Sequence, residues 1–512
     1  MNDVDASLRT VAKSSIVVLA GTLVGYIIAY LFRVIIARYL GPTEYGVFSI
    51  AVSVTTIALG VAAFGMDGTV PRFVSYYSGL GDRARTRGTV LSSIKITLPL
   101  SLVAAALLFA SADWLSTVFK NDSLAAVVKI TSVSIPFGTL AVVLGSASIG
   151  LQKIQYDIYA RKIGREALRL ALAAFFLSMG IGVIGVAAAY TLSAVVMPIL
   201  LIYYLNKSGL SLVGGVKPVY ATSEILRFSV PLLLTGVVNL LMGWTDPIII
   251  GYFLDPTAVG VYSASLPTAQ LLLTGSIVLT PIFLSVIGSL YAKKKIEDVG
   301  SVYRSVTKWV LMVSLPIFFI VALFPRQILN ILFGQSYVGG VTPLIVLSFG
   351  YLLLSLSATA NNILLVAGKT KTLFKNSLAV AATILSLDVL LIPSMGITGA
   401  ALASASALTL SFLFLVLRAR SVSGISPFNS SNLRVVVAAA ASAGAISLIN
   451  RLYSLSSPAS LLVVAALFGV IYAVLLVVMR CFDQNDITII KAAEKKTGVR
   501  LGPVRDILKK FL

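Results

Sequence analysis

The sequence predicts an all-α, polytopic membrane protein with 14 transmembrane helices, arranged as two parallel six-helix lobes plus two extra C-terminal helices. Two observations lead to this prediction. Apolar residues make up 58% of the 512 residues and charged residues only 12%, with a mean hydropathy of +0.98. One sequence element also recurs 214 residues further along the chain. The first observation places the chain in lipid, and the second indicates two homologous halves.

Apolar runs of about 18 to 25 residues, long enough to cross roughly 30 Å of hydrocarbon, recur along the sequence. Backbone polar groups find no water in lipid, so these runs are expected to be helices. The seventh and eighth spans are long and contain Pro231, Pro267 and Pro281, so we expect a tilt or a kink there. The predicted spans are 15–37, 46–66, 90–110, 124–149, 163–180, 182–205, 225–250, 258–290, 303–324, 341–366, 373–393, 396–418, 433–452 and 458–480.

Lysine and arginine residues predict the orientation, because cytoplasmic loops carry an excess of them. With the N-terminus inside, only five fall on outer connections: Arg38, Lys120, Lys129, Arg326 and Arg451. Both termini are therefore expected in the cytoplasm, in a multi-pass protein of the cell membrane. The same rule accounts for most of the net charge of +21, so nucleic acid is not expected as a partner.

The repeated element is the stretch 35–49, which returns as 249–263 with eight of fifteen residues identical. A second pair, 182–187 and 396–401, has the same offset. Six predicted crossings separate the two copies, and an even number makes the halves parallel repeats. The shared Leu-x-Pro-Thr-x-x-Gly pattern is expected to form a tight outer connection, in which proline presets the turn and glycine permits a close helix start.

The repeat predicts four parts of the chain. They are an N-terminal lobe of spans 1–6 (1–222), a C-terminal lobe of spans 7–12 (223–420), the unpaired spans 13 and 14 (421–482) and a basic cytoplasmic tail (483–512).

The side chains that most catalytic and metal sites need are missing from the sequence. It contains no histidine and a single cysteine, Cys481, which removes His-based acid–base catalysis, disulfides and Cys/His metal sites. It has no phosphate-binding Gly-x-x-x-x-Gly-Lys-Ser/Thr loop, and its acidic residues are scattered. We therefore expect no enzyme, no cofactor and no metal, but a transporter that works with a cavity and a few charges.

Three segments carry a resemblance to a known family. They are 37–48 after the first span, 64–73 at the end of the second, and 246–251 with 259–262 at the start of the second lobe. With these segments and its two-lobed, fourteen-span layout, the chain resembles the polysaccharide transport branch of the MOP exporter superfamily, which contains the lipid-linked oligosaccharide flippases. The resemblance covers roughly residues 7 to 480.

This resemblance implies export of a polyprenyl- or dolichyl-linked glycan from the inner to the outer leaflet by alternating access. The implied partners are that glycan and membrane lipids, a monomer is expected, and a coupling ion is left open. Three alternatives remain: an ion-coupled exporter of small amphipathic molecules, a lipid II-type flippase and, from another class, a membrane glycosyltransferase.

Arg33 and Asp246 are the first candidates for gating or substrate binding, because charges within a membrane are costly and usually functional. Arg33 lies roughly 10 Å from the middle of the first span, and Asp246 is the repeat equivalent of its neighbour Phe32. In one interpretation Arg33 pairs with Asp246 in one state and with the cargo's pyrophosphate in another. In the other, Arg33 snorkels to the outer headgroups and Asp246 caps a helix end.

Other candidates lie within spans or at their ends. Asp67 and Arg72 form either a cytoplasmic latch or a local turn stabilised by the aspartate. Lys129 and Asp388 are cavity candidates. Polar amides within spans serve either interhelical hydrogen bonds or sugar contacts: Asn239, Asn361 and Asn362.

Several basic residues lie where inner spans begin and are candidates for a diphosphate headgroup: Lys95, Arg165, Arg169 and Arg227. The positive-inside rule explains the same residues without any ligand.

Exchanging two charges tests the pairing of Arg33 with Asp246. We expect Arg33→Asp and Asp246→Arg each to lose most of the transport rate, and the double exchange to recover part of it because opposite charges face each other again. A double variant no more active than either single variant would contradict the pair.

Overall fold

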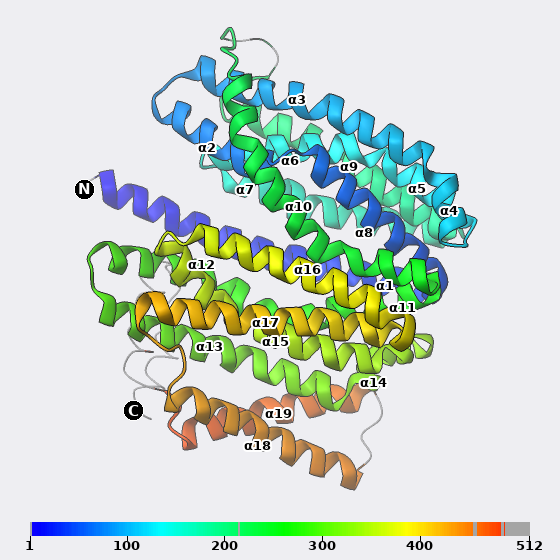
Figure 1. The fold of residues 1–512 in the computed structure, drawn as a ribbon, viewed down its shortest axis with the longest axis vertical. Coiled ribbons are helices and arrows are strands. Elements are labelled where there is room, and N and C mark those ends of the chain that lie inside the picture. The colour runs from blue at the N-terminus through cyan, green and yellow to red at the C-terminus, as the bar shows by residue number, and fades with distance from the viewer. Residues whose placement is uncertain (1–2, 213, 215, 454–457, 483–485, 487–512) are drawn as a thin grey trace. The chain divides into compact units, whose positions relative to one another are not determined.

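The computed structural model describes residues 3–212, 214, 216–453, 458–482 and 486 (Figure 1). Every regular element in this described part is helical, which confirms the predicted all-α class. Contacts divide the chain into two compact units. The first unit is Ser14–Ser263, and the second is Ala264–Leu512 together with Met1–Lys13.

The described residues contain twelve helical segments that are long and apolar enough to cross a membrane, which confirms a polytopic protein. Helix α1 (Asp3–Ala62) contains two predicted spans, separated by a kink at Gly41. The fifth predicted span corresponds to α8 (Arg165–Ser178), whose 14 residues are too few to cross a bilayer alone. The total of fourteen crossings therefore stays a prediction.

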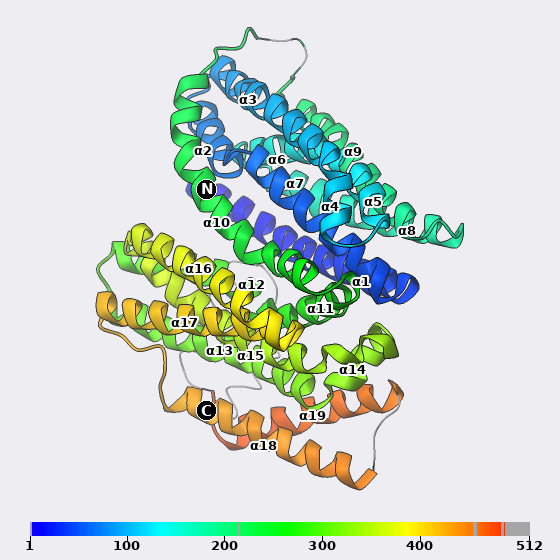
Figure 2. The same cartoon turned by 45° about the vertical axis from the view of Figure 1, so that its right-hand side comes forward.

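The first unit is built around α6, which packs against α2, α3 and α9, while α9 packs against α8 (Figure 2). Fully buried Met66 of α2, Val90 of α3, Leu144 of α6 and Met197 of α9 belong to its apolar core. The elements of this unit besides α1 and α8 are α2 (Met66–Gly79), α3 (Arg83–Ala110), α4 (Ala112–Val118), α5 (Ser123–Ser132), α6 (Ser134–Gly150), α7 (Ile154–Asp157), the π-helix η1 (Ile158–Gly164), α9 (Gly182–Lys207), α10 (Thr222–Phe253) and the start of α11 (Pro256–Ala269).

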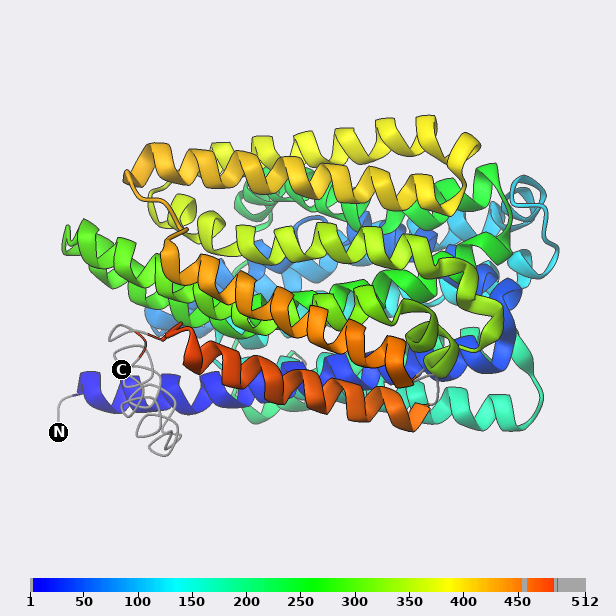
Figure 3. The same ribbon diagram turned by 90° about the horizontal axis from the view of Figure 1, so that it is seen from below.

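In the second unit the central helix is α15, which packs against α12, α13 and α17. Helix α16 lies along α17, and α18 packs on α13 and pairs with α19 (Figure 3). The elements that begin in this unit are η2 (Gln270–Leu273), α12 (Thr274–Ala292), α13 (Ile296–Leu323), α14 (Pro325–Leu332), η3 (Gln335–Gly340), α15 (Val341–Val366), α16 (Thr370–Met395), α17 (Ile397–Ser423), α18 (Ser430–Tyr453) and α19 (Pro458–Val478).

The eighth predicted span is interrupted, as its prolines predict. Helix α11 ends two residues after Pro267, a 3₁₀ turn follows, and α12 resumes at Thr274. The seventh span is one continuous helix, α10, although it contains Pro231 and Pro247.

The two repeats share an unusual backbone conformation at equivalent positions. Gly182 precedes the body of α9 with φ 63°, and Gly396, exactly one repeat later in sequence number, precedes α17 with φ 60°. Only glycine adopts this left-handed region without strain. The glycines that repeat in the sequence at these positions therefore also repeat the backbone conformation.

Helix α10 belongs to the first compact unit, because it packs against α2 and α3. The predicted boundary between the N-terminal lobe (1–222) and the C-terminal lobe (223–420) divides the chain at a different place from the two compact units, and it stays a prediction. Of the predicted tail 483–512, only Asp486 lies within the described residues.

The two copies of the Leu-x-Pro-Thr-x-x-Gly element meet each other. The hydroxyl oxygens of Thr43 and Thr257, which are repeat equivalents, lie 2.9 Å apart. A Cβ atom on Gly46 would lie 1.7 Å from the carbonyl oxygen of Pro256, and one on Gly260 would lie 1.9 Å from that of Pro42. The contact is thus reciprocal, and at both glycines it leaves no room for a side chain.

This reciprocal contact predicts that alanine is not tolerated at either glycine. We expect Gly46→Ala to lower the free energy of unfolding by about 1–3 kcal/mol, because backbone must move to admit the methyl group. Thermal unfolding of the detergent-solubilised protein measures this. The matched control is Gly79→Ala, where an added Cβ has no neighbour within 4 Å. Equal unfolding temperatures for the two variants would contradict the close approach.

Candidate substrate-translocation site

A seam joins the second half of α1 and α2 to the start of α11 and to α10, which runs in the opposite direction to the second half of α1. It begins at the contact of Gly46 with Pro256 and continues where Gly60 meets the side chain of Leu240. Further along, the hydroxyls of Thr69 and Ser229 lie 2.9 Å apart. In the predicted orientation, this seam runs from the outer to the inner end of the span.

Aromatic and charged side chains close the far end of this seam. The guanidinium of Arg72 lies 4.2 Å from the ring centroid of Phe228, and Phe73 meets the same ring edge-on. The hydroxyl of Tyr77 donates to Glu224 over 3.3 Å. These contacts tie α2 to α10 at the predicted inner end.

Beside the seam, the first half of α1 runs parallel to η1 and α8. Gly21 faces Ile158, Gly25 faces the carbonyl of Lys162, and Phe32 faces Arg169. A Cβ on Gly25 would lie 2.6 Å from that carbonyl oxygen. The small residues of α1 thus let the two helices approach closely, as they do in membrane proteins generally.

This approach buries a charged cluster around Arg169 of α8. Its guanidinium lies 4.3 Å from the ring centroid of Phe32 and 5.8 Å from that of Tyr190. Its Nη2 donates to Oε2 of the buried Glu166. The other oxygen, Oε1, accepts from Nη2 of Arg165 at 2.9 Å and from Nε at 3.1 Å. One buried carboxylate therefore holds two guanidinium groups.

The cluster carries more positive than negative charge. Arg33 interacts electrostatically with Arg169, and Lys162 with Arg165 and Glu166, so positive charges outnumber the carboxylate of Glu166. In addition, Nε of Arg169 is buried and has no hydrogen-bond partner among the described residues. A buried donor without a partner is costly unless a ligand completes it. An anion would match the excess of positive charge.

A second ion pair stabilises the π-helix that precedes α8. Arg161 donates to Asp157, four residues earlier, and this pair sits against Gly145 of α6. The Asp157 carboxylate is buried as well. Since π-turns occur frequently at functional sites, the position of η1 directly before the arginine cluster supports a functional role for that cluster.

The structure places the first two predicted candidates in different surroundings. Arg33 lies beside Arg169 and within electrostatic range of Tyr45. Asp246 is buried in α10 and accepts a hydrogen bond from the hydroxyl of Tyr262. Asp246 is buried and Arg33 is half-buried, and the direct pairing of Arg33 with Asp246 stays a prediction.

Asp67 and Arg72 lie in α2, where both side chains are exposed. Asp67 is in the first turn of the helix, as a stabilised local turn requires. Arg72 contacts Phe228 of α10. In the cytoplasmic latch that the sequence suggests, the contact would therefore be that of the Arg72 guanidinium with the Phe228 ring.

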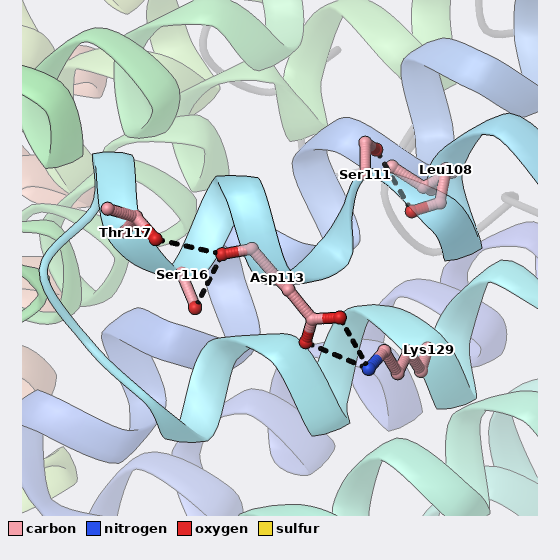
Figure 4. Close-up of polar contacts among 6 residues, drawn as sticks. All are labelled: Leu108, Ser111, Asp113, Ser116, Thr117 and Lys129. Carbon is pink, nitrogen blue, oxygen red and sulfur yellow. Dashed lines mark hydrogen bonds and ion pairs between the residues drawn. The ribbon is translucent and has the colours of Figure 1, made fainter.

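Lys129 of α5 pairs with Asp113 of α4 (Figure 4). Its Nζ lies 2.8 Å and 2.9 Å from the two carboxylate oxygens. The Asp113 side chain is 73% exposed, and such exposed pairs contribute at most about 1 kcal/mol. This pair accounts for Lys129 without any ligand.

The remaining candidates are dispersed. Asp388 is fully buried in α16. Asn239 is exposed in α10, and Asn361 is half-buried in α15. Its neighbour Asn362 donates to the carbonyl oxygen of Thr280 over 3.1 Å, an interhelical bond of the kind predicted.

The second unit contains a buried ion pair that was not among the predicted candidates. Lys308 of α13 donates to Oδ2 of Asp486 at 2.6 Å, and the indole nitrogen of Trp309 donates to Oδ1 at 2.9 Å. Both charged side chains are only 1% exposed. Asp486 is thus bound to two neighbouring residues of α13.

Sequence reasoning included Arg165 and Arg169 among the headgroup candidates but missed Glu166, Phe32 and Tyr190. The signal for Glu166 was available, because it stands three residues before Arg169, a spacing that brings side chains together on a helix. Nothing in the sequence identifies the π-helix or the rings on Arg169, since the rings belong to α1 and α9 and reach Arg169 only through the packing of these helices against α8.

Two repeats of apolar helices and a buried basic cluster define an integral membrane protein with a two-repeat transporter fold. The chain belongs to the family described as polysaccharide biosynthesis protein, whose model matches residues 11–287, more than half of the sequence. A second model, MatE, matches residues 231–390. These matches confirm the predicted resemblance to the MOP exporter superfamily.

A relative from Haloferax volcanii, named as a probable low-salt glycan biosynthesis flippase, Agl15, is 28% identical over 419 residues, covering 77% of this chain and 80% of that protein. Two solved structures share the fold. The lipid II flippase MurJ in an inward closed conformation has a TM-score of 0.73 at 16% identity, covering 91% of this chain and 98% of that one. An inward-facing multidrug resistance MATE family transporter has a TM-score of 0.66 at 16% identity, covering 80% and 98%.

Proposed function

We propose that this protein is a flippase, which moves a lipid-linked oligosaccharide or polysaccharide unit from the inner to the outer leaflet by alternating access. Its family, its fold and the name of the Haloferax relative support this function. The observation that carries it is the arginine cluster of α1 and α8, with its excess of positive charge. We assign that cluster to the phosphate or diphosphate of a polyprenyl or dolichyl carrier.

The chemistry of the cluster suits this cargo. Guanidinium groups bind phosphate oxygens through paired, charge-assisted hydrogen bonds. The ring centroids of Phe32 and Tyr190 lie 4.3 Å and 5.8 Å from the Arg169 guanidinium, and such contacts restrict its side chain before a phosphate binds. Moving a lipid across the bilayer breaks no covalent bond and so needs no catalytic group. A cluster that can bind a phosphate therefore suits transport rather than enzymatic chemistry.

Alternating access assigns a role to the seam. The contact of the two Leu-x-Pro-Thr-x-x-Gly copies lies at its predicted outer end, and the aromatic contacts of Phe228 lie at its predicted inner end. We propose that the outer contact closes the path to the outer leaflet and opens when the cargo leaves. A seam without side chains at Gly46 and Gly260 can close tightly and still part, because few contacts must be broken.

The topology forms part of the proposal. Fourteen crossings arise if the kinked α1 contributes two and if α8 crosses together with η1. Both termini then lie in the cytoplasm, in a monomer of the cell membrane, as the positive-inside rule predicts. A coupling ion is compatible with this arrangement but has no assigned residue.

A second candidate function is ion-coupled export of small amphipathic molecules, which the fold shared with a multidrug resistance transporter favours. The two functions differ in cargo, so transport of defined probes separates them.

Reconstitution in vesicles tests the flippase. We expect the protein to move a fluorescent polyprenyl-diphosphate disaccharide across the bilayer, measured by protection from a membrane-impermeant quencher. Arg169→Ala should reduce the rate at least about tenfold, because it removes charge-assisted hydrogen bonds worth roughly 1.5–3 kcal/mol. The control is Lys129→Ala, which breaks only the exposed pair with Asp113 and should stay within about twofold.

Wild-type vesicles that move the glycolipid no faster than empty vesicles would overturn the flippase. Transport of an amphipathic cation by the same vesicles would then favour the small-molecule exporter.

Cross-linking tests the outer contact. Thr43→Cys with Thr257→Cys, in a Cys481→Ser background, should form a disulfide when a mild oxidant such as copper phenanthroline is added and stop transport, and reduction should restore it. Both threonines are exposed. Cys481 is buried, and burial raises the pKa of its thiol, so it reacts slowly even before replacement. The matched control joins Asp113→Cys to Lys129→Cys with a short bis-methanethiosulfonate cross-linker, which the same reduction cleaves. Full transport by a completely cross-linked Thr43–Thr257 variant would show that this contact need not open.

A further inference from the structure

The carboxylate of Glu166 occupies the place where an anion would be expected. It is buried, its two oxygens accept from two different arginines, and both arginines belong to the same helix. A phosphate group presents oxygens in a similar arrangement, so Glu166 already provides what a phosphate would provide.

We propose that Glu166 is an internal counter-ion that holds Arg165 and Arg169 in place while no cargo is bound, and that the cargo's phosphate displaces it. This inference rests on the proposed function. It adds a positioning residue, which competes with the cargo for the same donors and so makes release possible.

Three observations support an exchange rather than a permanent ion pair. Arg165 is 42% exposed and Arg169 only 12%, so an incoming anion can reach one guanidinium first. The buried Nε of Arg169 has no partner among the described residues and offers a further donor. The ring centroids of Phe32 and Tyr190 also lie 4.3 Å and 5.8 Å from the Arg169 guanidinium, so these contacts can persist when the carboxylate withdraws.

Charge explains why a competitor is useful. Without Glu166, the guanidinium groups of Arg165 and Arg169 would lose the carboxylate that they share, and a diphosphate would bind them more tightly and leave more slowly. The carboxylate lowers the affinity and returns to the arginines as the cargo departs. Transport that must both bind and release a multiply charged headgroup gains from this competition.

Removal of the carboxylate tests the exchange. The probe is a fluorescent short-chain polyprenyl diphosphate, titrated against the purified full-length protein in nanodiscs. We expect Glu166→Gln to tighten its binding about tenfold. In the vesicle assay the same variant should show a lower half-saturating concentration and a lower maximal rate, because release becomes slow. A residue that only stabilised the fold would weaken binding instead.

The matched control is Asp157→Asn. This aspartate is buried and paired with Arg161 in the same segment, but it does not contact Arg165 or Arg169. We expect its probe affinity to equal that of the wild type. Glu166→Ala serves as the second variant, and tighter binding by either Glu166 variant supports the exchange.

Wild-type binding with unchanged or weaker binding in the Glu166 variants would overturn the exchange and leave the flippase intact. If a Glu166 variant binds the probe and the wild type does not, the result supports the exchange, because the carboxylate of the wild type then blocks the binding site. If neither the wild type nor a Glu166 variant binds the probe, the exchange is wrong, and the vesicle assay decides separately on the flippase.

Discussion

The reciprocal approach of Gly46 to Pro256 and of Gly260 to Pro42 is the contact on which the first unit depends. Lipid supplies no hydrophobic force between helices, so association rests on close packing of small residues. At these two positions backbone meets backbone, and the equivalent hydroxyls of Thr43 and Thr257 meet beside them. This anchor sets where α10 lies along α1 and α2, and the remaining contacts of the seam follow from it.

The same principle builds the arginine cluster. Gly21 and Gly25 bring α1 against η1 and α8, and this approach places Phe32 on Arg169. Burying these charged groups has an unfavourable desolvation free energy. The carboxylate of Glu166 and the aromatic rings offset part of this cost. The uncompensated part is what the proposed phosphate ligand would use. Close packing and the arginine cluster therefore have one origin, the small residues of the first span.

Much of this fold could be predicted, because the relevant signals are local. Apolar length predicts the spans, the prolines of the long eighth span predict a tilt or kink in it, and the repeat predicts that Gly182 and Gly396 are equivalent. The contacts of the site could not be predicted in the same way. Arg169 meets Phe32 only because two helices far apart in sequence lie side by side. In addition, the positive-inside rule accounts for every arginine at the inner end of a span, so it cannot single out those that bind a ligand. The hydrogen bond from Tyr262 to Asp246 was likewise not predictable from depth in the membrane, because it depends on how α11 packs against α10.

The anchoring of Asp486 on Lys308 and Trp309 has a consequence for the order in which the protein is made. The charge pair joins residues 178 positions apart, so it cannot form when α13 is synthesised. At about 5–20 residues per second, roughly ten to forty seconds pass before the ribosome supplies the aspartate. During that interval α15 to α19 must enter the membrane beside an α13 whose final salt bridge is still missing. The second unit is therefore completed late, and its last step comes from a segment that follows the final described helix.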